Sequence, residues 1–230
     1  MIANDNPPVI AIDGPSASGK GTVAAEVARA LGWHYLDSGA LYRLTTLAAL
    51  RKGTALEDGA GLALIAAALP VEFRAGRPWL AGEDVSTALR QEDVGTAASQ
   101  VAAHPQVRTA LLARQRAFQQ APGLVADGRD MGSVVFPAAT LKVFLTAAVE
   151  IRAERRHKQL MEKGMYGKMA DVVDDLRRRD ERDSSRPVAP LKHYHDAIFL
   201  DTTGLSVAQA VTKILGWWRE KGESPKVSGS

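Results

Sequence analysis

Short apolar runs alternate with stretches of helical spacing along most of the chain. The runs are typical of buried strands and lie at residues 9–12, 33–36, 124–127, 141–145 and 197–200. Helical spacing follows them at residues 22–31, 38–50, 94–120, 169–179 and 206–219, and in a stretch that runs through Arg152, Arg155 and Arg156 to about residue 162. Strands that alternate with helices predict an α/β fold, in which a parallel sheet is covered by helices on both faces.

Several polar residues and glycines mark the expected ends of these helices. Gly32 and Gly53 follow helical stretches, where glycine commonly ends a helix in the left-handed conformation. Ser38 is expected to cap the second helix. Ser206 and Gln209 have the spacing of a capping box, which predicts the start of the last helix.

The pattern changes between residues 71 and 85. Two short strand-like stretches, 71–74 and 78–81, flank the turn 75–77, which predicts an antiparallel hairpin. Antiparallel strands inside an otherwise alternating α/β chain indicate an insertion.

Composition places the chain among ordinary globular proteins. It has 230 residues, of which 46% are hydrophobic and 24% are charged. The longest apolar run, 62–69, is too short to span a bilayer, and the first residues lack the pattern of a secretory signal. Cysteine is absent, so disulfides are excluded. We expect a cytoplasmic protein with no membrane partner.

The positive charge is concentrated in one segment. The chain carries a formal net charge of +3, and residues 151–186 alone hold eleven Lys and Arg against eight Asp and Glu. Such a segment fits an anionic partner, or else the mixed charges of a solvated helix face. The interleaved acids argue against a long nucleic-acid groove, and we expect no stable nucleic-acid partner.

The stretch I-D-G-P-S-A-S-G-K-G-T, at residues 12–22, carries the clearest chemical signal. It nearly fits G-x-x-x-x-G-K-[ST] and stands between a predicted strand and a predicted helix, as a phosphate-binding loop requires. Lys20 would bring its positive charge to the β- and γ-phosphates. The predicted ATP-binding residues are Gly14, Pro15, Ser16, Ala17, Ser18, Gly19, Lys20, Gly21 and Thr22.

Gly21 stands where the pattern asks for a magnesium-binding hydroxyl. Its presence argues against a GTPase-type metal site. Mg²⁺ would instead be held mainly by nucleotide phosphates and water, with Asp127, at the end of an apolar strand, ordering one such water. The G-K-G-T ending is what nucleoside monophosphate kinases carry.

Two arginines near strand ends suggest a second phosphate site. Arg43 lies in the helix after the second strand, and Arg129 follows the strand that ends at Asp127. Guanidinium groups can fork onto one phosphate, although either residue alone could be an ordinary surface arginine.

Five motifs in order along the chain resemble bacterial cytidylate kinases, a family of P-loop nucleoside monophosphate kinases. They read I-D-G-P-S-x-x-G-K-G-T, L-D-S-G-A-L-Y-R, A-A-S-Q-V-A, A-D-G-R-D-M-G and R-D-x-x-R-x-x-A-P-L. The resemblance implies one three-layer P-loop kinase domain over residues 1–230. It implies a monophosphate-binding insert at 61–99 and a helical lid at 158–183, and the composition of 221–230 predicts a disordered tail.

The resemblance also implies which residues act. The implied CMP-binding residues are Ser38, Arg43, Ser99, Arg108, Arg129, Asp130, Asp183 and Arg186, and the implied catalytic residues are Lys20, Arg129, Arg182 and Arg186. Among these, Ser99, Arg108 and Asp130 would read cytosine, and Arg155 and Arg179 are further lid arginines.

The expected reaction transfers the γ-phosphoryl group of ATP to CMP or dCMP, with Mg²⁺, in a monomer. A carboxylate such as Asp130 can accept a hydrogen bond from the exocyclic amine of cytosine, whereas the O4 atom of uracil would face it as a second acceptor. Two alternatives stay open: another small-molecule kinase on the same scaffold, such as an adenylate, uridylate or shikimate kinase, and a non-catalytic nucleotide switch or nucleic-acid-associated protein.

Overall fold

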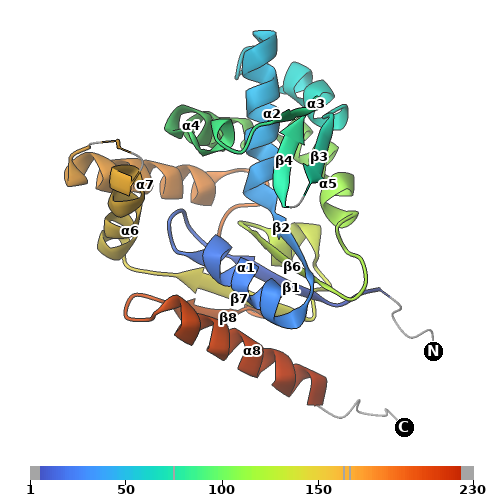
Figure 1. Ribbon diagram of the computed structural model, residues 1–230, viewed down its shortest axis with the longest axis vertical. Helices are drawn as coiled ribbons and strands as arrows, with labels where there is room; N and C mark the ends of the chain where they lie inside the picture. Colours follow the sequence, from blue (N-terminus) through green and yellow to red (C-terminus); the bar gives the residue numbers. More distant parts are fainter. Residues whose placement is uncertain (1–5, 75, 163, 166, 224–230) are drawn as a thin grey trace.

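Five parallel strands form the central sheet of the protein (Figure 1). The structure is a computed structural model, and it describes residues 6–74, 76–162, 164–165 and 167–223. In space the strands run in the order β2 (His34–Asp37), β6 (Leu124–Gly128), β1 (Val9–Asp13), β7 (Leu141–Thr146) and β8 (Ile198–Asp201). The carboxyl ends of the strands therefore meet at one edge, which is where ligands bind in such sheets.

Helices cover both faces of this sheet. On one face, α1 (Lys20–Leu31) and α8 (Val207–Glu223) pack against Ile10 and Ile12. On the other face, α2 (Ser38–Lys52) and α5 (Pro105–Arg116) pack against Val9 and Ala11. Because alternate residues of β1 enter the two layers, the strand is buried on both sides, and this explains its unbroken apolar sequence.

A second, antiparallel sheet lies beside α2 at the upper end of the molecule in Figure 1. It contains β3 (Val71–Arg74), β4 (Arg77–Leu80) and β5 (Glu83–Asp84). The hairpin predicted at 71–81 is confirmed by the pairing of β3 with β4. This sheet, the short helix η1 (Ala88–Arg90) and most of α3 (Gly59–Ala67) and α4 (Glu92–Val101) fall in the segment 61–99.

The single helical stretch expected over 94–120 is wrong, because α4 and α5 are separate helices. Pro105 is the first residue of α5, and proline has no N–H with which to continue a helix from α4. The break exposes the carbonyl of Ala102, which accepts a hydrogen bond of 3.1 Å from Arg108.

Two further helices, α6 (Val149–Glu162) and α7 (Met169–Ser185), pack against each other through Ala153, Val172 and Leu176. Helix α7 runs six residues beyond the predicted 169–179, so Asp183 lies in its last turn. Helix α8 continues to Glu223, three residues into the predicted tail, and residues 224–230 lie outside the described part of the chain.

The α/β fold with a parallel sheet, a small antiparallel sheet and covering helices is confirmed. No helix in the described ranges is both long and apolar enough to cross a membrane.

Candidate active site

The predicted phosphate loop joins β1 to α1 at the carboxyl edge of the sheet. Gly19 adopts φ of 92°, which glycine tolerates, and it precedes the first turn of α1. Gly14 is in such close contact with β7 that a Cβ there would lie 1.9 Å from the carbonyl oxygen of Leu145. The loop is therefore shaped by its glycines, and its backbone lies at the amino end of a helix, which favours an anion.

Lys20, in the first turn of α1, has an almost fully buried side chain. Its Nζ donates to the carbonyl of Pro15 at 3.2 Å. Burial, together with the positive charge of Arg129, lowers the pKa of Lys20 to about 8 against the opposing effect of Asp127. Lys20 forms no ion pair among the described residues, and a phosphate in the loop would give this ammonium an anionic partner. The Oγ of Ser18 is buried with no hydrogen-bond partner in the same part of the chain, so the loop also holds an unpaired hydroxyl donor.

Two arginines of α6 support the loop from outside. Arg152 donates to the carbonyl of Ser16 at 3.1 Å, and Arg155 donates to that of Ser18 at 2.9 Å. Arg152 also forms an ion pair of 2.7 Å with Asp180 of α7. These hydrogen bonds hold the two loop carbonyls toward α6. The two arginines therefore support the backbone of the loop and do not enter the phosphate site.

Asp127 lies near the end of β6, next to the loop. Its Oδ2 accepts a hydrogen bond of 2.6 Å from the hydroxyl of Tyr35. Burial and the nearby Asp37 raise the pKa of Asp127 to about 6, while Lys20 opposes the shift. A Cβ on Gly21 would lie 3.6 Å from the same Oδ2, so the glycine lies next to this carboxylate. A buried carboxylate beside a phosphate loop fits Mg²⁺ that is held mainly by phosphates and water, and no group of three or more potential metal ligands occurs in the described ranges.

Asp37, rather than Ser38, caps helix α2. Its Oδ1 accepts from the N–H of Ala40 at 3.0 Å, and its Oδ2 pairs with Arg43 at 2.5 Å. Ser38 is instead the first helical residue and is buried, and its Oγ lies where a Cβ on Gly128 would clash with it at 2.6 Å. The expected cap was wrong by one residue because the carboxylate at the strand end reaches the same N–H groups.

Three charged residues among those expected to bind CMP, namely Arg129, Asp183 and Arg186, form one network. Arg129 donates to Asp183 at 2.7 Å and to the hydroxyl of Ser16 at 2.8 Å. Arg186 approaches Asp183 at 4.0 Å and keeps its Nε buried without a partner among the described residues. Burial opposes the shift, but Arg129 and Arg186 lower the pKa of Asp183. The network links the phosphate loop to the end of α7.

Of the three residues expected to recognise the base, Arg108 and Asp130 contact each other. The guanidinium of Arg108 contacts the carboxylate of Asp130, and both side chains are buried. The same guanidinium lies 5.6 Å from the ring centroid of Tyr42. Ser99 of α4 has a buried Oγ with no hydrogen-bond partner in the described part of the chain. The fold therefore brings a buried anionic group and a buried cationic group together, and the hydroxyl of Ser99 keeps unused hydrogen-bonding capacity.

Three further arginines of α6 and α7 occupy different environments. Arg179 of α7 and Arg156 of α6 both pair with Glu92 of α4, the former at 2.9 Å. Arg182 is half-buried, and its Nε makes no hydrogen bond within the described ranges. The structure thus joins the segments 61–99 and 158–183 through Glu92, and it leaves Arg182 with donor capacity.

The sequence patterns did not identify four residues that have evident roles in the structure: Asp13, Tyr35, Asp37 and Glu92. Asp13 and Asp37 belong to the first two motifs and stand at strand ends, a position that could have identified them. Tyr35 and Glu92 carry no such signal, because their partners lie far away in the sequence.

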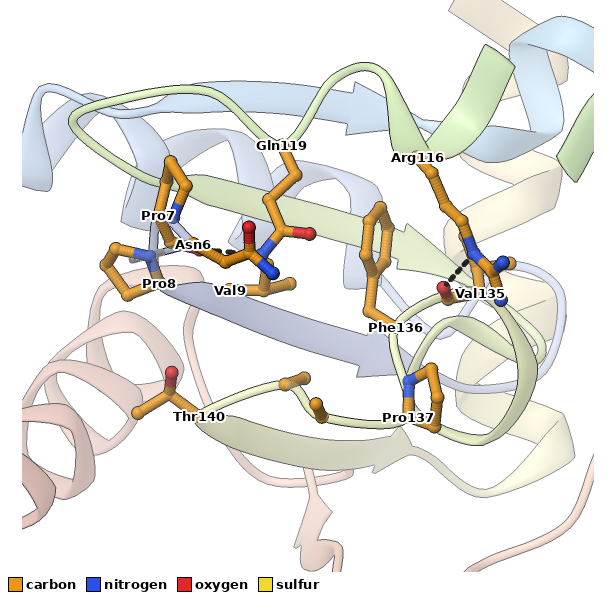
Figure 2. Close-up of a pocket in the computed structure, with 12 residues that line it drawn as sticks. Asn6, Pro7, Pro8, Val9, Arg116, Gln119, Val135, Phe136, Pro137 and Thr140 are labelled. Carbon is orange, nitrogen blue, oxygen red and sulfur yellow. Dashed lines mark hydrogen bonds between the residues drawn. The ribbon is translucent and has the colours of Figure 1, made fainter. Parts of the chain in front are cut away.

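A cavity of about 470 Å³ lies elsewhere, at the amino ends of β1 and β7. Figure 2 shows Pro7, Gln119 and Phe136 around it and Arg116 bonded to the carbonyl of Val135. None of the predicted site residues lines this cavity. The cavity therefore lies at the opposite end of the strands from the phosphate loop.

Comparison with known proteins identifies the family of the chain. The family model described as cytidylate kinase matches residues 10–220. The chain is 61% identical to a cytidylate kinase from Chromobacterium violaceum over 93% of its own length and 96% of the relative, and 60% identical to one from Paraburkholderia phymatum over 92% and 93%. A solved structure of an uncharacterized protein from Eubacterium ventriosum shares the fold, with a TM-score of 0.54, 11% identity and coverage of 93% of this chain and 98% of that chain. The family predicted from the five motifs is thus confirmed, and the chain belongs to the cytidylate kinase family.

Proposed function

We propose that this protein transfers the γ-phosphoryl group of ATP to CMP or dCMP and releases ADP with CDP or dCDP. Membership of the family supports the assignment of the reaction class. The observation that supports the choice of substrate is the buried pair of Arg108 and Asp130, because it offers a cation and a hydrogen-bond acceptor to one edge of the base. ATP and a cytidine monophosphate are the small-molecule substrates, and we expect a cytoplasmic monomer without a stable nucleic-acid partner.

The phosphates of ATP bind residues 14–22. The backbone N–H groups of the loop and the amino end of α1 receive them, and Lys20 places its charge on the β- and γ-phosphates. Ser18 and Thr22 add hydroxyl donors. Mg²⁺ bound through phosphates and an Asp127-ordered water supplies charge neutralisation when it is present.

The acceptor phosphate binds opposite the loop. Arg43 leaves Asp37, and Arg129 and Arg186 turn from Asp183, to fork onto this phosphate, while Asp183 receives the ribose hydroxyl. Arg129 already bonds to Ser16 of the loop, so it stands between the two phosphate positions. An attacking phosphate oxygen carries its own negative charge, so no general base is required.

The base binds between α4, α5 and the turn after β6. Cytosine donates its exocyclic amine to Asp130 and accepts at N3 and O2 from Arg108 and Ser99. Ser38 lines the nearby end of β6. Uracil would set its O4 atom against the Asp130 carboxylate, and an unpaired buried acceptor disfavours it.

Lid arginines complete the site when the two segments close. Arg182 and Arg186 place charge near the transferred group, and Arg155 and Arg179 hold the lid against the loop and the insert. Closure excludes water, which would otherwise accept the phosphoryl group and hydrolyse ATP.

An acceptor panel tests the proposal. ADP formation from ATP and magnesium is measured side by side with CMP, dCMP, UMP, AMP and no acceptor. Turnover confined largely to CMP and dCMP supports the proposal. Strong turnover with another monophosphate overturns the base assignment, and ADP formation that is indifferent to every acceptor points to an ATPase or switch.

A further inference from the structure

Asp13, the last residue of β1, holds a buried carboxylate that the mechanism above does not use. Its side chain is almost fully buried, and both oxygens accept hydrogen bonds: Oδ1 from the N–H of Met131 and Oδ2 from that of Gly132, each at 2.8 Å. No ion pair of Asp13 occurs within 4 Å among the described residues, although Arg129 lies close enough to lower its pKa. Burying a carboxylate that has no cationic partner costs free energy, so its position beside two backbone donors calls for an explanation.

The N–H groups of Met131 and Gly132 lie at the start of a helical turn. Residues Met131–Val135 form one turn, and Asp130 occupies the position before it. The first N–H groups of a helical turn have no partner inside the turn, and an Asp in the preceding position is among the best side chains to accept from them. Asp130 makes no such cap, since its carboxylate faces Arg108 instead.

We infer that Asp13 is a positioning residue for the base site: it accepts the N–H groups of Met131 and Gly132 so that the Asp130 carboxylate stays free to face the acceptor base. The inference deepens the proposed function and rests on it. Without Asp13, Asp130 would rotate back to cap its own turn, and its oxygens would leave the position where cytosine donates.

The need for two acceptors explains why a carboxylate is required. An asparagine could accept from one N–H, but its amide would present a donor to the other. The turn would then keep one unpaired N–H, and Asp130, as the residue directly before the turn, is placed to accept from it.

The test compares kcat/KM for CMP with kcat/KM for UMP in the wild-type protein and in Asp13→Asn, at about pH 8, above the pKa of about 7 of Asp13, where both oxygens are acceptors. Both substrates are used by the same folded molecules, so the ratio does not depend on the folded fraction. We expect the CMP-to-UMP ratio to fall by about tenfold, through KM for CMP, with KM for ATP changed far less. Ile214→Ala in α8, fully buried and on the other face of the sheet, is the control for a purely structural loss, and its ratio should equal that of the wild type.

A double-mutant cycle asks whether Asp13 acts through Asp130. In the Asp130→Asn background, Asp13→Asn should change the ratio no further, because the group that it positions is gone. A wild-type ratio kept by Asp13→Asn, or a further full-sized fall in the Asp130→Asn background, overturns the inference while the substrate assignment stands. A wild-type protein without preference for CMP overturns the proposed function itself, and the inference with it.

Discussion

Glu92 of α4 and Arg179 of α7 form an ion pair of 2.9 Å between segments 87 residues apart in the sequence. Arg156 of α6 contacts the same carboxylate, so one acid receives two arginines. Burial lowers the pKa of both arginines, and the charge of Arg179 lowers that of Arg156 further. Glu92 therefore holds together two like charges that would otherwise push α6 and α7 away from α4.

Replacing Glu92 by Gln is expected to open the lid. The two guanidinium groups would lose their shared counter-charge, and hydrogen exchange in α7 should accelerate by about fivefold or more. Exchange followed by mass spectrometry in the absence of nucleotide measures this. Glu154→Gln removes the same charge from an exposed position of α6 and should leave the exchange unchanged. Equal exchange in the wild-type protein and both variants would show that Glu92 does not hold the lid.

Lys20→Met should abolish most phosphoryl transfer while the fold persists. The side chain is buried, and methionine fills a similar volume without the charge, so the loss falls on stabilisation of the transferred phosphate. We expect kcat/KM for ATP to drop by about a hundredfold or more, as for the loss of a single transition-state donor. Thermal unfolding of the same variant serves as the control, and a fall of less than a few-fold in kcat/KM would remove Lys20 from the catalytic residues.

Asp130→Asn should relax the choice between CMP and UMP. An amide can turn its NH₂ toward the O4 atom of uracil, so the acceptor-against-acceptor contact disappears, while cytosine loses a charged acceptor. The CMP-to-UMP ratio of kcat/KM is expected to fall by about tenfold or more. Steady-state kinetics with both monophosphates at saturating ATP gives the ratio, and an unchanged ratio would mean that another group reads the base.

Asp13 gives the stability of the fold a defined dependence on pH. Burial raises the pKa of Asp13 from an ordinary value near 3.8 to about 7. Between about pH 4 and pH 7 the folded protein therefore keeps a proton that the unfolded chain releases, and its free energy of unfolding falls as pH rises through this window. Asn at this position has no proton to release, so the stability of Asp13→Asn relative to the wild-type protein should improve from about pH 5 to about pH 8.

Urea unfolding of both proteins at the two pH values measures this difference. Arg129, Asp130 and Tyr194 also face Asp13, but they are shared by both proteins and cancel to first order. A constant difference between the two pH values would mean that Asp13 is ionised at both.

Alanine substitutions at two glycines distinguish the effect of close packing on stability from that of helix propensity. Gly14→Ala would put a Cβ 1.9 Å from the carbonyl oxygen of Leu145, and we expect a loss of about 2 kcal/mol or more in the free energy of unfolding, with weaker ATP binding. Gly216 lies in α8 with open space where a Cβ would stand, so Gly216→Ala should stabilise the fold by about 0.5–1 kcal/mol. Thermal denaturation and ATP titration measure both, and a neutral Gly14→Ala would contradict the packing argument.

The local features of the site could be predicted from the sequence because they depend on neighbours in the chain. Gly14, Gly19 and Lys20 form a loop between a strand and a helix whose ends are encoded by adjacent residues. The positions of Arg43 and Arg129 could be predicted because both residues follow strands, and the carboxyl ends of parallel strands meet at one edge of the sheet. The family motifs then extended this to residues in α4, α5 and α7.

The sequence by itself therefore determined the α/β order, the phosphate loop and the residue types gathered at the strand ends. The tertiary structure decided which of these groups hold one another: Asp13 meets Gly132 across 119 positions, and Arg152 and Arg155 turn toward the loop carbonyls. Side-chain partners of this kind are selected by burial and by the unpaired donors and acceptors that packing brings together, and neither quantity exists until the sheet and its helices have assembled.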